Sequence, residues 1–123
     1  MTTALAPAEQ ALLDSVPTGL YIAGEWQDAE DARRFDVHDP ATGEVIRSIA
    51  DASPADGLRA MDAAAAAQES WAATAPRERS EILRRAFDLV QTHKEDLALL
   101  MTLEMGKPLA EARGEVVYGG EFL

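Results

Sequence analysis

Apolar side chains recur at helical spacing through the second half of the chain. The clearest repeat places apolar residues at offsets of one, four, five and eight positions, which is one face of a helix. Its members are Ile82, Leu83, Ala86, Phe87 and Val90. A weaker stripe precedes it through an alanine-rich stretch and consists of Leu58, Met61, Ala65 and Ala72, with Trp71 nearby. The spacing therefore predicts amphipathic helices in both places.

Residues that favour helix starts give the beginnings of these two helices. Ser53 supplies a capping hydroxyl directly before Pro54, and proline is well suited to the first helical position. Pro76 opens the second helix in the same way, and Thr74 is its expected cap. We therefore expect a break between the two helices at about residue 75.

Two further helices are expected after residue 93. The third runs from about residue 94 to Gly106 and places three apolar residues on one side, Leu97, Leu100 and Met101. Pro108 fits the first turn of a fourth helix, which continues through Val117. Helices usually close with glycine, a polar residue or a basic turn, but this one reaches Leu123 without such a signal. We therefore expect the last helix to be cut short.

Between residues 20 and 50 the pattern is that of short β-strands. Residues 20–23 and Trp26 flank Gly24, which suits the tight turn of a hairpin. Two extended runs, 34–37 and 44–50, flank an Asp-Pro-Ala-Thr-Gly turn signal. In the second run Val45 and Ile49 share one face, and Ile46 and Ser48 share the other.

The predicted domain organisation has two parts. Residues 1–18 contain a short helical pattern between Pro7 and Pro17, and we expect a loose and dispensable N-terminal arm there. Residues 19–123 carry the predicted strands and helices. The length of 123 residues and the apolar fraction of 47% are typical of one folding unit, but the many alanines predict a thin core.

Composition excludes several functions. A formal charge of −11 would repel nucleic acid and anionic membrane surfaces, because affinity for either comes largely from Lys and Arg. The sequence has no signal-peptide pattern and no apolar run of about 18 residues, so we expect a cytoplasmic protein. The absence of cysteine removes disulfides, thiolate metal sites and cysteine nucleophiles together.

The histidines and serines do not form a catalytic pattern. His38 precedes Asp39, and His93 precedes Lys94, but neighbours on a strand or helix point in different directions. We therefore interpret both histidines as surface residues, and two histidines so far apart predict no metal site. We interpret Ser53 as the cap of a helix and Ser80 as a residue on a helix surface. The glycines fit neither phosphate-binding pattern, G-x-x-x-x-G-K-[ST] or G-x-G-x-x-G.

Four arginines form a local basic patch on this acidic chain, at Arg77, Arg79, Arg84 and Arg85. Because Glu78 and Glu81 alternate with them, we favour a solvated helix face with salt bridges over an anion site. Lys107 lies at a helix-to-helix corner, where we expect an exposed lysine without a catalytic role. The residues therefore predict no catalytic, cofactor or metal site.

Five segments resemble the start of aldehyde dehydrogenases in their order and spacing. They are Tyr21–Trp26, Asp39–Ile46, Trp71, Arg79–Leu83 and Thr102–Ala112. The resemblance covers about residues 20–123. The phrase Glu-Met-Gly-Lys-Pro-Leu-Ala-Glu-Ala, followed by Gly114-Glu115-Val116, looks most like the succinate-semialdehyde dehydrogenase branch.

The resemblance implies an α/β fold of which this chain is the N-terminal portion: short antiparallel hairpin strands followed by about four packed helices, without the doubly wound sheet and catalytic domain. In that family a cysteine thiolate attacks the aldehyde, hydride passes to NAD or NADP, and a glutamate activates water. The implied parent is a homo-oligomer. Backbone carbonyls near Val37 and Glu104 match a region that binds a structural alkali cation in some relatives; no catalytic or cofactor role is carried onto any residue here.

Two functional hypotheses remain. The first is an inactive fragment of an NAD(P)-dependent aldehyde dehydrogenase, whose partner is the remainder of that enzyme. The second is a non-catalytic helical interaction module derived from the same family, which would use exposed apolar helix faces. A cooperatively melting monomer or dimer favours the module, whereas aggregation or molten behaviour favours the fragment.

Overall fold

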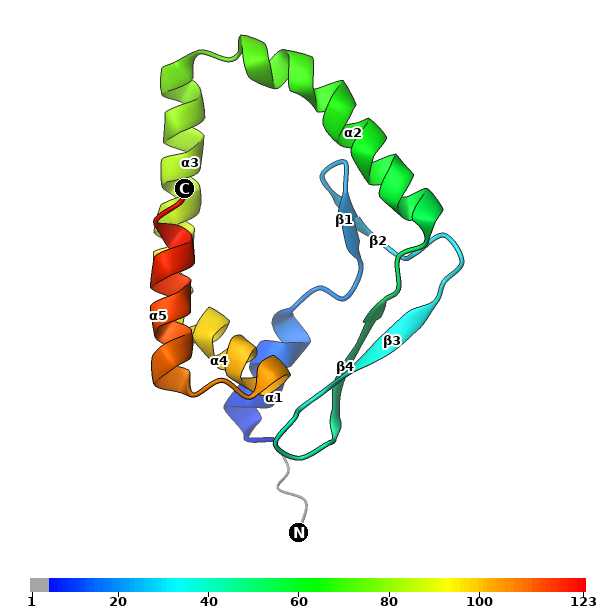
Figure 1. The fold of residues 1–123 in the computed structure, drawn as a ribbon, viewed down its shortest axis with the longest axis vertical. Coiled ribbons are helices and arrows are strands. Elements are labelled where there is room, and N and C mark those ends of the chain that lie inside the picture. The colour runs from blue at the N-terminus through cyan, green and yellow to red at the C-terminus, as the bar shows by residue number, and fades with distance from the viewer. Residues whose placement is uncertain (1–4) are drawn as a thin grey trace.

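The computed structural model describes residues 5–123, and Figure 1 shows the order of its helices and strands. The elements of this part of the chain are α1 (Pro7–Ser15), β1 (Leu20–Ile22), β2 (Glu25–Gln27), β3 (Arg34–His38), β4 (Val45–Ala50), α2 (Pro54–Ala73), α3 (Pro76–Thr92), α4 (Lys94–Met105) and α5 (Leu109–Gly120). The predicted hairpin strands and the four helices after residue 53 are all present.

Two separate antiparallel hairpins precede the long helices. In the first, Tyr21 pairs with Trp26, and the ring centroids of these two residues lie 5.0 Å apart. Its two turn residues, Ala23 and Gly24, both have positive φ (55° and 87°), as a tight type I′ turn requires. In the second, β3 pairs with β4, and the Asp-Pro-Ala-Thr-Gly segment turns between them.

Two small apolar clusters surround α4. Leu13, Ile46 and Leu103 form one, so that α1, β4 and α4 meet there. The other consists of Ala98, Ala112 and Val116 and joins α4 to α5. Ile46 is buried, and the three apolar residues predicted to share one side of α4, Leu97, Leu100 and Met101, all line one groove. Leu97 is 38% exposed, whereas the small Ala98 is fully buried because α5 packs closely against it.

Helix α1 belongs to the predicted loose arm, yet it packs onto the rest of the chain. Leu13 is only 2% exposed, and α1 contacts α4. Arg47 of β4 also donates a 3.1 Å hydrogen bond to Asp14. Helix α1 is therefore held against the rest of the chain, because Leu13 finds partners that are distant in sequence. The boundary at residue 18 itself stays a prediction.

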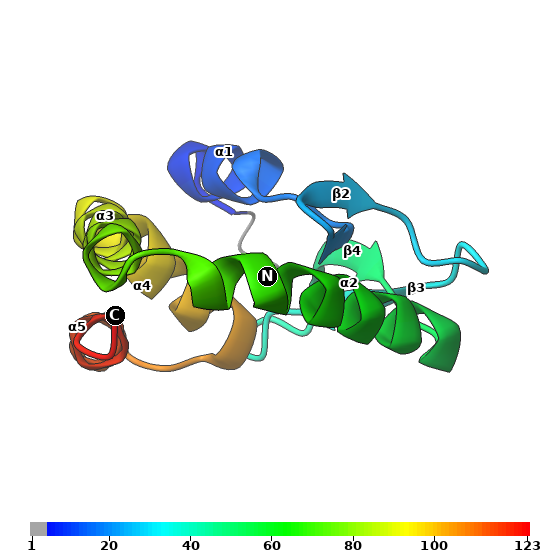
Figure 2. The same ribbon diagram turned by 90° about the horizontal axis from the view of Figure 1, so that it is seen from above.

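Helices α2 and α3 form an arch between the hairpins and α5, as both views show (Figures 1 and 2). The starts at Pro54 and Pro76 and the cap by Ser53 are confirmed. Thr74 is not the cap of α3, which is Ala75; instead the Thr74 hydroxyl donates to the Ser70 carbonyl and closes α2.

The arch buries very little of its apolar surface. Asp56 is the one buried residue of α2, and α3 has none. The predicted stripe on α2 exists, but Leu58 and Met61 are 62% and 68% exposed. The accessible surface of the chain is 8570 Å², whereas a folded monomer of 13.2 kDa exposes about 6400 Å². The excess, about 2100 Å², exceeds the roughly 800 Å² that one partner contributes to a standard interface.

Candidate functional site

The two histidines lie in different, exposed parts of the molecule. The Nδ1 atom of His38 lies 3.3 Å from the Gly43 carbonyl oxygen, across its own turn. The neighbouring Asp39 carboxylate folds into that turn, where it accepts hydrogen bonds from the Ala41 N–H (2.8 Å) and the Thr42 hydroxyl (3.0 Å). His38 and Asp39 are therefore not arranged as an acid–base pair.

His93 sits at the corner between α3 and α4. Its Nδ1 lies 3.5 Å from the Asp96 carboxylate, because three residues along a helix start bring the two side chains to the same side. Both side chains are exposed. The adjacent Glu95 accepts from Arg113 of α5 at 2.8 to 3.1 Å. This hydrogen bond lowers the pKa of Glu95 and raises that of Arg113, so the pair ties two helices together.

Asp56 is the most extensively bonded side chain and is 1% exposed. Its carboxylate accepts from the Ser53 N–H (2.8 Å), the Ser53 hydroxyl (2.9 Å) and the Glu30 N–H (3.2 Å). Arg59 adds an ion pair one turn further along α2. The Ser53 backbone hydrogen bond and then Arg59 hold the pKa of Asp56 well below its usual range, against a smaller opposing effect of burial. Asp56 therefore fastens α2 to the loop after β2.

Lys107 differs from its prediction. Its side chain is 23% exposed rather than open to solvent, and it forms an ion pair with Glu115 of α5. Gly106 precedes it with φ of 73°, and a Cβ there would lie 3.0 Å from the Cγ of Pro40. The corner between α4 and α5 is therefore packed against the turn of the second hairpin, and Lys107 braces that corner.

The arginines of α3 do not all behave as expected. Arg84 forms the predicted salt bridges, with Glu81 at 3.5 Å and Asp88 at 3.2 Å. Arg79 does not: it is half-buried, and its Nε is shielded from solvent without a hydrogen-bond partner among residues 5–123. It lines a recess of about 340 Å³, called the Arg79 recess below. The recess is lined by Trp71, Pro76, Arg79, Ser80, Leu83 and Leu123.

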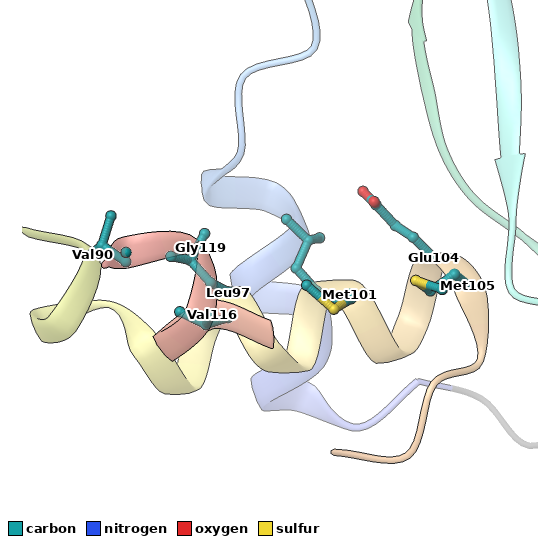
Figure 3. A pocket seen from close by; sticks show the side chains of 9 residues that line it. Val90, Leu97, Met101, Glu104, Met105, Val116 and Gly119 are labelled. Carbon is teal, nitrogen blue, oxygen red and sulfur yellow. The ribbon is translucent and has the colours of Figure 1, made fainter. Parts of the chain in front are cut away.

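A second hollow, the α4–α5 groove, has a volume of about 400 Å³ and is drawn in Figure 3. It is lined by Val90, Leu97, Leu100, Met101, Glu104, Met105, Val116, Gly119 and Gly120. Glu104 is the one charged residue among these apolar side chains. The groove offers a surface for apolar contact, and none of its side chains carries a thiol, hydroxyl or amine nucleophile.

Comparison with known proteins identifies the family of this chain. The model of the aldehyde dehydrogenase family matches residues 26–123. The chain belongs to the aldehyde dehydrogenase family. It is similar to the succinate-semialdehyde dehydrogenase of Paenarthrobacter nicotinovorans, with 67% identity over 79 residues, which are 64% of this chain and 18% of that protein. It is 45% identical over 102 residues to the NADP(+) succinate-semialdehyde dehydrogenase GabD of Escherichia coli, covering 83% of this chain and 21% of GabD.

Solved structures agree with the family. The succinate-semialdehyde dehydrogenase of Burkholderia pseudomallei superposes with a TM-score of 0.84 and 42% identity, over 98% of this chain and 24% of that one. The betaine aldehyde dehydrogenase of Staphylococcus aureus, in complex with NAD+, gives 0.86 and 31%, over 89% of this chain and 22% of that one. The predicted fold class is confirmed: the chain has the fold of an N-terminal portion of an aldehyde dehydrogenase. It spans about a fifth of the length of the curated relatives that it matches.

The structure also bears on two kinds of ion site, one for a metal ion and one for the structural alkali cation. Among residues 5–123, no three His, Asp or Glu side chains lie where they could share a metal ion. Val37 packs against the cluster that contains Leu103, the residue before Glu104, so the two backbone regions named for a cation are near each other. The cation site stays a prediction. No helix in the described part of the chain is long and apolar enough to span a membrane.

Sequence reasoning missed Asp56 and misjudged Arg79. For Asp56 a signal existed, since Ser53 followed three residues later by an acidic residue is the pattern of a capping box. Its bond to Glu30 could not be read from the sequence, because the two residues are 26 positions apart. For Arg79, the alternating charges predicted exposure, but the turn between α2 and α3 brings Trp71 and Pro76 around its side chain.

Proposed function

We propose that this chain is the N-terminal structural part of an NAD(P)-dependent aldehyde dehydrogenase, and that the complete enzyme oxidises succinate semialdehyde to succinate. The observation that carries the proposal is the high identity with the Paenarthrobacter nicotinovorans enzyme. Relatives named for glutarate semialdehyde, from two Pseudomonas species, are less similar. Together they support a substrate that is a short semialdehyde with a carboxylate at its other end.

The chain alone is expected to have no dehydrogenase activity. The resemblance to the family implies a cysteine nucleophile, and none of the 123 residues is cysteine. NAD(P) would supply the hydride acceptor in the complete enzyme, but the residues here do not fit a dinucleotide. The glycines lack the phosphate-binding pattern, and the α4–α5 groove places the Glu104 carboxylate among apolar walls, which would repel phosphates.

The role that these residues support is structural. Asp56, Leu13 and the Glu95–Arg113 pair fix the hairpins and helices relative to one another, while the arch of α2 and α3 leaves apolar side chains uncovered. The remainder of the enzyme is the partner that would cover them, and a homo-oligomer is the expected assembly. The cytoplasmic location and the lack of nucleic-acid or membrane partners stay predictions.

An interaction module is the alternative function, and one observation favours it. The exposed face of α2 carries Leu58, Met61 and Trp71, which could bind another protein as well as the rest of a parent chain. If the chain is such a module, it should be a soluble monomer or dimer that melts cooperatively.

Two measurements test the proposed function. The purified chain is incubated with succinate semialdehyde and NAD+ or NADP+, and absorbance of the reduced cofactor is followed; we expect no production above the enzyme-free blank. A chimera then joins this chain to the part of the Paenarthrobacter nicotinovorans enzyme that follows the matched stretch, with the unmodified enzyme as control. We expect the chimera to be active. Activity of the chain alone, or an inactive chimera, would contradict the proposal.

A further inference from the structure

Arg79 occupies an unusual environment for an arginine of this chain. Six arginines are paired with carboxylates: Arg33, Arg34, Arg47, Arg59, Arg84 and Arg113. Arg77 and Arg85 are exposed, so water can solvate them. Arg79 alone is half-buried and has neither an ion pair nor a side-chain hydrogen bond within residues 5–123. The Nε atom of Arg79 is therefore shielded from water without a hydrogen-bond partner in this part of the chain.

The Arg79 recess has the chemistry of a socket for a carboxylate. Removal of a guanidinium from water is costly unless a charged acceptor compensates, and its planar fork of N–H donors matches the two oxygens of a carboxylate. Trp71, Pro76 and Leu83 form apolar walls around it, which strengthen a charged hydrogen bond by excluding water. Ser80 also lines the recess, and a serine hydroxyl is a second hydrogen-bond donor.

The mostly apolar walls favour an acceptor carried by a folded polypeptide over a free, hydrated ion. Trp71, Ile82 and Leu83 are each 41% exposed, so this corner of the arch also leaves apolar surface to be covered. A packed protein segment can cover that surface and present a carboxylate in one step. A small dicarboxylate could pair with the guanidinium, but it would leave the apolar surface uncovered.

We propose that Arg79 binds a side-chain carboxylate, from an Asp or a Glu, that belongs to the portion of the parent enzyme outside the fifth spanned by this chain. This inference rests on the proposed function. Arg79 then acts as a positioning residue: it fixes the corner between α2 and α3 against the rest of the enzyme and takes no part in the chemistry.

The test uses the active chimera with Arg79→Met, Arg79→Lys and the matched control Arg77→Met. Arg77 lies two residues earlier in α3, is exposed and has no ion pair among the described residues. We expect Arg79→Met to speed thermal inactivation roughly tenfold or more, because a buried carboxylate loses its partner. Arg79→Lys should recover part of the loss, since it keeps the charge without the fork. Arg77→Met should stay within about twofold of the parent chimera, and KM for the aldehyde should not change in any variant.

A second readout does not depend on stability. Phenylglyoxal modifies accessible arginines, and mass spectrometry locates the adducts. Arg77 should react in both the chain and the chimera, whereas Arg79 should react in the chain and be protected in the chimera. In a third arm, succinate is added to the chain. An Arg79-dependent rise in its unfolding midpoint would identify a free carboxylate as the ligand and overturn the proposal.

The outcomes separate the two proposals. If the unsubstituted chimera is inactive, the proposed function fails and this inference fails with it. If the chimera is active but Arg79→Met behaves as Arg77→Met does, or Arg79 is modified equally in both proteins, only the inference is wrong.

Discussion

Replacement of Leu13 by alanine should destabilise the isolated chain strongly. Leu13 is 2% exposed and packs with Ile46 and Leu103. Truncation removes three buried carbons, each worth about 0.8 kcal/mol, and leaves a cavity that adds to the loss, which together give roughly 3 kcal/mol. The unfolding entropy of 123 residues is about 0.26 kcal/mol/K. Where the chain unfolds in one cooperative transition, the midpoint of thermal unfolding should therefore fall by about 12 °C.

Circular dichroism at 222 nm during heating measures this midpoint, and Leu89→Ala is the matched control. The same atoms are removed there, but Leu89 is 60% exposed on α3, so its midpoint should move by no more than about 2 °C. If Leu13→Ala and Leu89→Ala melt alike, α1 adds nothing to the core. The N-terminal arm would then be loose, as the sequence alone suggested.

Two further predictions concern single positions. The pKa of Asp56 is lowered in the folded chain, so its contribution to stability is complete above about pH 5 and is lost as pH falls through the folded-state pKa. Asp56→Asn should make the chain less stable at pH 7. The urea midpoint of the variant should also fall less than that of the unsubstituted chain when pH is lowered from 5 to 3, and an equal fall would contradict this role of Asp56. Gly106→Ala should cost roughly 1–2 kcal/mol, because φ is positive there and Pro40 is close. Gly114→Ala, in open space within α5, should instead stabilise by about 0.5–1 kcal/mol in the same urea titration.

The sequence predicted the elements of the fold because their signals are local. Pro54 and Pro76 set helix starts, Gly106 ended a helix in the left-handed conformation, and Gly24 made the hairpin turn. Each of these depends on one residue and its neighbours. Thr74 shows the limit of such reasoning: a hydroxyl between two helices can cap either one, and only the backbone geometry of the junction decides.

Burial could not be predicted to the same degree, because it depends on which surfaces meet. The strongest amphipathic pattern, on α3, buries no residue completely, whereas the weakly patterned α4 lies at the centre of both apolar clusters. The predicted exposure of Arg79 was wrong for the same reason. The alternating charges predicted a solvated Arg79, but the residue is half-buried in a recess that Trp71 of α2 also lines.

The distribution of burial also predicts at which positions the effect of a substitution on stability depends on the rest of an enzyme. Helices gain most of their stability from tertiary packing. Leu13 and its partners pack within this chain, but α2 is anchored mainly at its first turn through Asp56, and its far end meets α3 beside the Arg79 recess. Substitutions around Leu13 should therefore have similar effects in the isolated chain and in a complete enzyme. Those at the junction of α2 and α3 should have their full effect only when the remaining polypeptide covers it.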